Sequence, residues 1–332
     1  MKKENAEKFR ILPQGFMRNT YFGSYSGLLL VLLVFGTFLS FRSPYFLTVK
    51  NIMNVFRQVS VYGIISCGMA FVIITAGIDL SVGSVTGISG ATVAKLVTEG
   101  IMPYGMAIIV CLVMGIMIGS LNGYLISYTG IPPFVMTLGT MISLRGLCYI
   151  ICDGKPIGNL PEFMTTLGMG FIWKIPTPIL LMISVFIISG IILYKTPYGR
   201  YVYAVGGNPT AAFHAGINAK QVIAWTYTLS GLFCAFAGII LTSRNASASP
   251  TGGNSFELEA IAACAMGGIS MAGGYGSIIG VFLGALLMGF INNGMNLMYI
   301  TSYWQLVVKG IIIAGAVIYS MISAQRSQEK LN

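Results

Sequence analysis

Long apolar runs separated by short polar segments recur along the whole chain. Most runs are about 18–25 residues long, the length that an α-helix needs to cross a bilayer. They lack the in-and-out alternation that membrane β-strands show. The pattern predicts an all-α membrane protein with about ten transmembrane helices. The predicted spans are residues 24–41, 58–76, 83–99, 104–128, 134–151, 177–194, 222–242, 257–272, 277–298 and 304–323.

Composition agrees with a protein surrounded by the lipid bilayer. The 332 residues are 55% hydrophobic and 8% charged, a balance that no ordinary soluble domain has. The formal net charge of +10 does not indicate a nucleic-acid partner, because the basic residues are scattered over loop ends. The six cysteines lie mostly inside apolar runs without zinc or redox spacing, so we expect small buried side chains.

The distribution of Lys and Arg predicts the orientation. An even number of spans places both termini on one side, and no small-residue cleavage site follows the first apolar run. The termini and residues 195–221 carry ten basic residues, whereas the opposite side carries six. Cytoplasmic segments are enriched in Lys and Arg. We therefore expect one polytopic domain, residues 1–332, with cytoplasmic tails at 1–22 and 324–332 and a cytoplasmic loop at 195–221.

The loop between the sixth and seventh spans predicts a short, well-capped helix. Asn208 can act as its N-cap, Pro209 suits the first helical position, and Gly216 can end it in a left-handed cap. A short capped helix on a basic loop is suited to docking another subunit. The small apolar face of this helix is predicted to consist of Ala211, Ala212 and Phe213.

Two distant segments suggest an internal duplication. Residues 76–87 read AGIDLSVGSVTG, and residues 267–280 read GGISMAGGYGSIIG. Both contain Gly-Ile-polar followed by Gly-Ser-x-x-Gly at a junction between two spans. Transporters often consist of two repeated halves with the pathway between them. The alternative is that Gly and Ser are simply frequent in membrane proteins, and the pattern does not decide between a parallel and an inverted repeat.

Polar residues within the apolar runs are candidates for a pathway or gate. Asp79 could belong to a gate or proton relay, or it could cap the following helix; Arg145 could line a pathway or form a structural pair. Glycines at four-residue spacing, Gly115, Gly119 and Gly123, indicate close helix packing. The pathway candidates are Asp79, Ser81, Ser84, Arg145, Ser270, Asn292, Asn293 and Asn296.

The sequence contains no recognisable catalytic constellation. Its single histidine, His214, excludes a paired-histidine metal site, and no Walker A pattern occurs. We therefore expect no catalytic residue, no bound metal and no cofactor on this chain.

The order of motifs resembles the permease subunit of ribose-, xylose- and galactose-type ABC sugar importers. The resemblance covers nearly the whole chain in the right order. The matching segments are GMAFVIITAGIDLSVGS (68–84), NGYLISYTGIPPFVMTLGTM (122–141), YGRYVYAVGGNPTAAFHAGIN (198–218), ELEAIAACAMGGISMAGGYGS (257–277) and WQLVVKGIIIAGAV (304–317).

The resemblance implies a multi-pass subunit of the bacterial cytoplasmic membrane that works with several partners. These are an ATP-binding subunit, which carries ATP and Mg, an extracytoplasmic sugar-binding protein, and a second permease copy or sister permease. Where this chain has Phe213-His214-Ala215, the family more often has a smaller or basic residue followed by Ser before the Gly-Ile pair. The coupling helix implied by the resemblance involves Gly207, Asn208, Pro209, Ala211, Ala212, Phe213, His214, Gly216 and Ile217.

An ion-coupled secondary transporter of a small polar solute is the alternative function. In that case Asp79 and Arg145 would be the coupling residues. The scarcity of carboxylates within the apolar runs argues against it.

Overall fold

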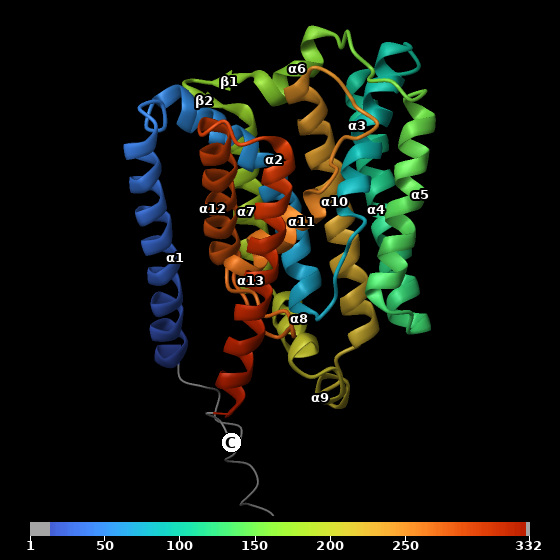
Figure 1. Ribbon diagram of the computed structural model, residues 1–332. Helices are drawn as coiled ribbons and strands as arrows, with labels where there is room; N and C mark the ends of the chain where they lie inside the picture. The colour runs from blue at the N-terminus through green and yellow to red at the C-terminus, as the bar shows by residue number, and fades with distance from the viewer. Residues whose placement is uncertain (1–13, 330–332) are drawn as a thin grey trace, which may run out of the picture.

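The computed structural model describes residues 14–329, with side chains described for residues 26–318, 321 and 322 (Figure 1). The structure is 77% helical, and the two short strands in the described residues form one antiparallel hairpin. The elements are α1 (Gln14–Arg42), α2 (Val49–Ile74), α3 (Val82–Thr98), α4 (Tyr104–Thr129), α5 (Pro133–Ile151), α6 (Glu162–Met169), β1 (Phe171–Ile172), β2 (Ile175–Pro176), α7 (Thr177–Lys195), α8 (Pro197–Gly207), α9 (Pro209–His214), α10 (Ala219–Asn245), α11 (Phe256–Met266), α12 (Ile278–Leu297) and α13 (Ser302–Glu329).

Six helices in the described residues are long and apolar enough to cross a membrane, namely α2, α4, α5, α7, α10 and α12. Helices α1 and α13 contain shorter apolar stretches, Ser26–Arg42 and Ser302–Ile318. These six helices confirm the prediction of an all-α membrane protein. Helices suit a bilayer because a helix satisfies its backbone hydrogen bonds internally.

The predicted span at 257–272 differs from the structure. Helix α11 has 11 residues and is therefore about 16 Å long, well short of the roughly 30 Å hydrocarbon core. The helix ends because Gly268 adopts a left-handed conformation with φ +81°. The prediction of a spanning helix at this place is wrong, and residues 267–277 form a loop instead.

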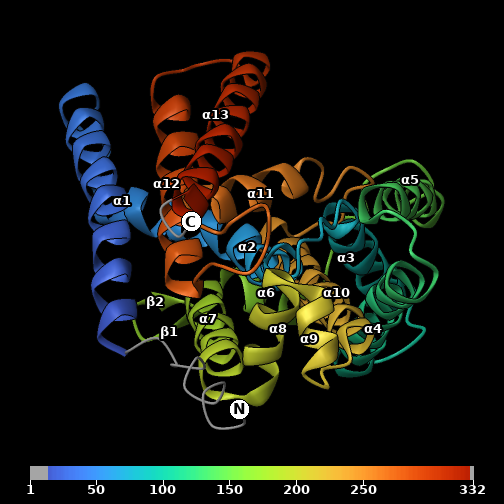
Figure 2. The same cartoon turned by 90° about the horizontal axis from the view of Figure 1, so that it is seen from below.

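Helices α2 and α10 form the centre of the bundle. In the most apolar 18-residue stretch of α2, 89% is buried inside the protein, and in that of α10, 67% is buried. The corresponding shares are only 22% for α4 and 17% for α5. Seen from the end that carries α9, α1 and α5 lie at opposite edges with α2 near the middle (Figure 2). The outer helices therefore present apolar faces to lipid or to another protein chain.

Glycines allow α4 to approach α10 closely. A Cβ atom on Gly115, Gly119 or Gly123 would overlap or crowd the backbone of α10. The four-residue glycine spacing thus allows close packing of these two helices, as predicted. The six cysteines are all buried and free, which confirms the expectation for them.

The start of α1, the end of α13 and the α8–α9 segment all lie at one end of the bundle (Figure 1). We call this the docking end; the β1–β2 hairpin and α6 lie at the other end. The predicted tail at 1–22 overlaps α1 from Gln14, and the predicted tail at 324–332 overlaps α13. The remaining parts of these tails, 1–13 and 330–332, lie outside the described residues.

Candidate functional site

The predicted short helix is present as α9, and its N-terminus is capped as expected. The side-chain oxygen of Asn208 accepts a hydrogen bond of 2.9 Å from the backbone N–H of Ala211. Pro209 occupies the first helical position, where no N–H is needed. Asn208 is also the residue that ends α8, so α8 and α9 meet at a single residue.

The C-terminus of α9 is closed by Gly216, which has φ +82°. Its N–H donates to the Phe213 carbonyl at 2.9 Å, and the N–H of Ile217 donates to the Ala212 carbonyl at 3.0 Å. This pair of bonds is the Schellman motif, which satisfies carbonyl groups that the helix end leaves free. The local prediction from Gly216 is therefore confirmed.

The predicted apolar face of α9 is wrong in one respect. Ala212 is only 4% exposed because it packs against the rest of the bundle, so it cannot belong to an outward face. Phe213 is 69% exposed, and its ring lies 5.8 Å from that of His214 in an edge-to-face arrangement. Ala211 is also exposed. The outward surface of α9 is thus built around Phe213.

Basic and aromatic side chains surround α9. Lys195 and Arg200 are exposed, and the Lys220 ammonium lies 5.5 Å from the centre of the Tyr128 ring at the end of α4. The hydroxyl of Tyr198 donates to the Val222 carbonyl at 3.3 Å, and burial raises its pKa. Tyr198 therefore remains a neutral hydrogen-bond donor that joins α8 to α10.

Asp79 lies in a buried hydrogen-bond network between α2 and α3. Its carboxylate accepts from the Ser81 N–H at 3.0 Å, the Ser81 hydroxyl at 2.6 Å and the Ser230 hydroxyl at 2.9 Å. The Asn122 amide donates to the Ser81 hydroxyl at 3.1 Å, and Thr140 donates to the Asn122 carbonyl oxygen at 2.6 Å. The N-cap residue of α3 is Ser81, and it makes no side-chain capping bond, so the predicted capping role of Asp79 is not seen. Asp79 instead belongs to a network that joins α3, α4, α5 and α10.

Arg145 and Ser84 also contact neighbouring segments. The Arg145 guanidinium donates to the carbonyls of Pro250 at 3.3 Å and Gly252 at 2.7 Å, in the loop that precedes α11. The Ser84 hydroxyl donates to the Met141 carbonyl of α5 at 2.9 Å. The sequence left two interpretations of Arg145 open, a structural pair or the lining of a pathway. These contacts favour the structural pair.

The four candidates in the second half are not brought together. Asn293 exchanges two side-chain hydrogen bonds with Asn51 of α2, at 2.8 and 3.0 Å, and Asn296 accepts from Gln305. These residues lie in the part of α12 away from the docking end, whereas Ser270 lies in the loop at the docking end. Asn292 is buried and donates weakly to Glu259 at 3.4 Å.

Sequence reasoning missed one ion pair inside the bundle. Lys309 of α13 lies 2.6 Å from Glu259 of α11, and both side chains are largely buried. The two residues are 50 positions apart, so no local pattern could have joined them. Within the described residues, no group of three or more His, Cys, Asp or Glu could hold a metal ion.

The architecture is that of a multi-helix membrane protein with a short capped helix on a basic loop, and comparison with known proteins identifies its family. Residues 51–317 match the family described as "Branched-chain amino acid transport system / permease component". The chain belongs to this family. It is a transport subunit rather than an enzyme, which confirms the expectation of a permease in the ABC sugar-importer class.

Several relatives match nearly the whole chain. The ribose import permease protein of Bacillus subtilis is 44% identical, covering 94% of this chain and 95% of the relative. The ribose import permease protein of Escherichia coli K12 is 40% identical, with 87% and 91% covered. The D-allose transport system permease protein of the same strain is 37% identical, with 89% and 90% covered. No solved structure matches significantly.

These relationships place the chain in the bacterial inner membrane as a multi-pass protein that works with an ATPase and a binding protein. The alternative of an ion-coupled secondary transporter is not favoured.

Proposed function

We propose that this permease carries a monosaccharide of the ribose, allose or xylose kind into the cell. The observation that carries the proposal is the similarity over 94% of the chain to a ribose import permease. Other relatives are named for allose and xylose, which are also neutral polyhydroxylated sugars. Such solutes need hydrogen-bonding groups rather than fixed charges along their route, and this chain has few charges within its helices.

Energy enters this permease through α9, which acts as the coupling helix on the ATPase subunit. Its support is the rigid double capping by Asn208 and Gly216 and the exposed ring of Phe213. ATP and Mg bind on the ATPase rather than on this chain. The excess of Lys and Arg at the docking end favours a cytoplasmic location for that end, and with it for both termini.

The chain crosses the membrane about ten times in two related halves. The crossing that contains α11 combines a non-helical segment, residues 246–255, with this short helix. Non-helical backbone is tolerated at membrane depth where it is covered by protein, and Arg145 donates to two carbonyls of that segment. The passage from α10 to α12 therefore requires no full-length helix.

A sugar-binding protein delivers the solute from outside, and a second permease copy, identical or a sister, completes the pathway. Helices α4 and α5 support a partner or lipid contact, because most of their surface lies outside the core of this chain. Most of the eight polar pathway candidates act by fixing helices around the pathway, since their side chains are engaged in hydrogen bonds between helices. Ser270, partly exposed at the docking end, is the one best placed to meet the solute.

Reconstitution tests the proposal. The permease, its ATPase and its binding protein are placed in proteoliposomes, and ATP-dependent uptake of labelled ribose is measured in competition with allose and xylose. We expect uptake that requires all three components. Uptake without the ATPase, or driven by an ion gradient alone, would contradict it.

The docking role of α9 is tested with Phe213→Asp and the matched variant Phe213→Leu. Aspartate places an unpaired charge in an apolar contact, which costs about 1–3 kcal/mol, so co-purification of the ATPase should fall roughly tenfold or more. Leucine keeps an apolar side chain and should retain the ATPase. Equal retention by both variants would show that α9 does not dock the ATPase.

A further inference from the structure

The last turn of α8 touches the end of α2 backbone to backbone. A Cβ atom on Gly206 would overlap the carbonyl oxygen of Ile74 and lie 2.7 Å from the amide nitrogen of Gly274. Gly206 is buried, so no side chain separates α8 from these two segments. Only glycine permits an approach this close.

The loop at 267–277 completes the same contact. The N–H of Gly274 donates to the Ile74 carbonyl at 2.8 Å, and a Cβ on Gly274 would lie 2.7 Å from the Cα of Gly207. A Cβ on Gly273 would lie 2.9 Å from the Cβ of Ala76. We call this meeting of α8, the end of α2 and the 267–277 loop the glycine contact. It brings together the two segments whose sequences resemble each other.

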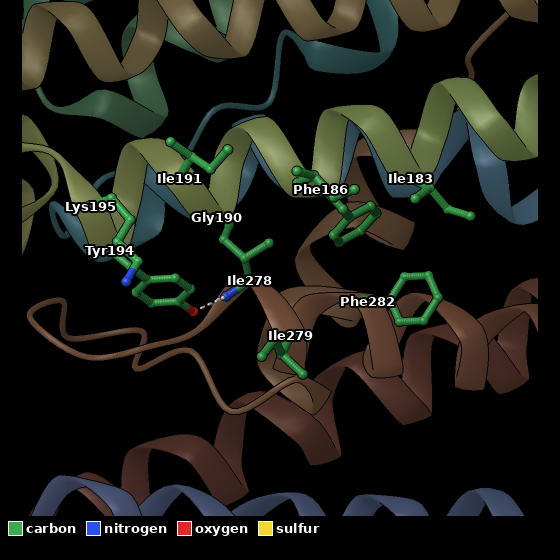
Figure 3. Close-up of a pocket in the computed structure, with 10 residues that line it drawn as sticks. Ile183, Phe186, Gly190, Ile191, Tyr194, Lys195, Ile278, Ile279 and Phe282 are labelled. Carbon is green, nitrogen blue, oxygen red and sulfur yellow. Dashed lines mark hydrogen bonds between the residues drawn. The ribbon is translucent and has the colours of Figure 1, made fainter.

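Two tyrosines hold the same loop against the α7–α8 corner. The Tyr203 hydroxyl donates to the Gly276 carbonyl at 2.7 Å. The Tyr194 hydroxyl accepts a bond of 2.8 Å from the Ile278 N–H, where α12 begins (Figure 3). The C-terminal end of the loop is therefore fastened to α8 through Tyr203, and the start of α12 is fastened to α7 through Tyr194.

Backbone contacts transmit displacement more faithfully than side-chain contacts. Side chains can change rotamer and absorb a small shift, whereas close-packed main chains cannot. Helix α8 is also joined to α9 through the shared cap residue Asn208. A displacement of α9 therefore reaches Gly206, and through it both the α2–α3 junction and the α11–α12 junction.

We propose that Gly206 and Tyr203 are positioning residues that link ATPase docking to the opening of the pathway. The inference rests on the proposed function of α9 as the coupling helix. In it, the glycine contact moves as one unit and carries the motion of α8 into the 267–277 loop. The link is distinct from the docking surface, because Gly206 is buried and does not itself meet the ATPase.

The glycine contact could only stabilise the fold, or it could transmit the motion of α8, and these two roles predict different results. If the glycine contact only stabilises the fold, its loss should lower the amount of assembled complex, and the remaining complex should work normally. If it transmits motion, the complex should assemble and hydrolyse ATP, while sugar uptake falls. The informative quantity is therefore the ratio of sugar transported to ATP hydrolysed, measured on purified complex.

The experiment compares Gly206→Ala and Tyr203→Phe with two controls in the complete reconstituted importer. Gly190→Ala is the control for the glycine, because a Cβ there meets only the Tyr194 ring at 3.9 Å. Tyr201→Phe is the control for the tyrosine, because its side chain is 42% exposed on the same helix. ATPase retention, binding-protein-stimulated hydrolysis and labelled ribose uptake are measured for each.

We expect Gly206→Ala to retain the ATPase and to lower the transport-to-hydrolysis ratio by about tenfold or more. Tyr203→Phe should lower the ratio by a smaller factor, about threefold, and both controls should match the wild type. A wild-type ratio in Tyr203→Phe would overturn the inference even if Gly206→Ala did not fold. A wild-type ratio in Gly206→Ala would also overturn it. Absence of uptake by the wild-type importer would contradict the proposed function itself, and the inference with it.

Discussion

The two helix junctions at 75–81 and 267–277 resemble each other in sequence but are held in different ways. The first is held by side chains: the Asp79 carboxylate accepts three hydrogen bonds, and Thr137 and Tyr227 both donate to the Ile78 carbonyl. Its partners come from α3, α5 and α10, with α4 joined through Asn122. Four helices therefore surround this junction.

The second junction is held mainly by backbone groups. Four of its glycines have positive φ values, between +73° and +157°. Ser270 donates from its N–H to the Tyr275 carbonyl at 3.0 Å, and Gly273 donates to the Ser270 carbonyl at 2.9 Å. Gly274 donates to the Ile74 carbonyl at the end of α2, and the Gly276 carbonyl accepts from Tyr203 of α8. Ile278, the first residue of α12, donates to Tyr194 of α7.

The difference indicates that the two junctions have different mechanical roles. A junction fixed by polar side chains from four helices is costly to rearrange, because each buried donor would lose its partner. A loop of glycines that depends on the docking end can follow the movement of that end. We expect the first junction to behave as a fixed point and the second as the moving part.

The largest expected effect is the loss of the Asp79 carboxylate. Asp79→Ala leaves two serine hydroxyls and one N–H without their acceptor, and should lower the free energy of unfolding by about 3 kcal/mol. Thermal unfolding in detergent measures this. The control Asp153→Asn neutralises a carboxylate whose side chain is 85% exposed and keeps a residue type that tolerates the positive φ at this position, so it should change stability little. Equal stability of both variants would show that Asp79 does not hold the first junction.

The next effect concerns backbone strain in the second junction. Gly274→Ala adds strain at φ +73° and a clash with α8, and should cost about 2–3 kcal/mol. Gly154→Ala is its matched control, because Gly154 has φ +69° and a Cβ there meets no atom within 4 Å. The control should cost only about 1 kcal/mol. If both variants lost the same stability, the contact with α8 would contribute nothing to the free energy of unfolding.

A smaller effect is expected for Asp79→Asn. The amide keeps one acceptor oxygen but places an NH₂ group against existing donors, so a loss of about 1–2 kcal/mol should result. Sugar uptake by the reconstituted importer should remain substantial, because no charge is needed for coupling. Complete loss of uptake with normal stability would indicate a functional charge and favour an ion-coupled mechanism.

The smallest perturbation probes the mobility of the two junctions directly. Ser81 is 1% exposed, whereas Ser270 is partly exposed, and the native cysteines are all buried. A maleimide reagent should therefore label Ser270→Cys much faster than Ser81→Cys. Adding the ATPase with ATP should change the rate at position 270 and leave that at position 81 unchanged. A changed rate at position 81 with an unchanged rate at position 270 would show that the first junction moves and the second is fixed.

Local features of the structure were predictable from the sequence. The ends of α9 follow from Asn208 and Gly216, because capping bonds join residues only a few positions apart. The long apolar runs predicted membrane helices because bilayer thickness fixes the length that a helix needs. The prediction from this rule was wrong at 257–272, since hydrophobicity alone does not show where glycine ends a helix.

The partners of the polar residues were not predictable. Asp79 and Ser230 are 151 positions apart, and Lys309 and Glu259 are 50 positions apart. The sequence also did not predict that Ala212 faces inward, because a short helix of small residues can turn either face to the bundle. Contacts between distant segments depend on how the helices pack, and the pattern of one segment contains no information about its neighbour.

The sequence by itself determined that this chain is a membrane-embedded permease with a short capped helix at 209–214, because hydrophobic length, capping chemistry and motif order are local properties. Only the tertiary structure decided that Gly206 touches Ile74 and Gly274. A glycine in a sequence is equally compatible with a turn, a helix end or a close contact. The choice among these depends on which backbone lies opposite, and that is fixed only when the helices assemble.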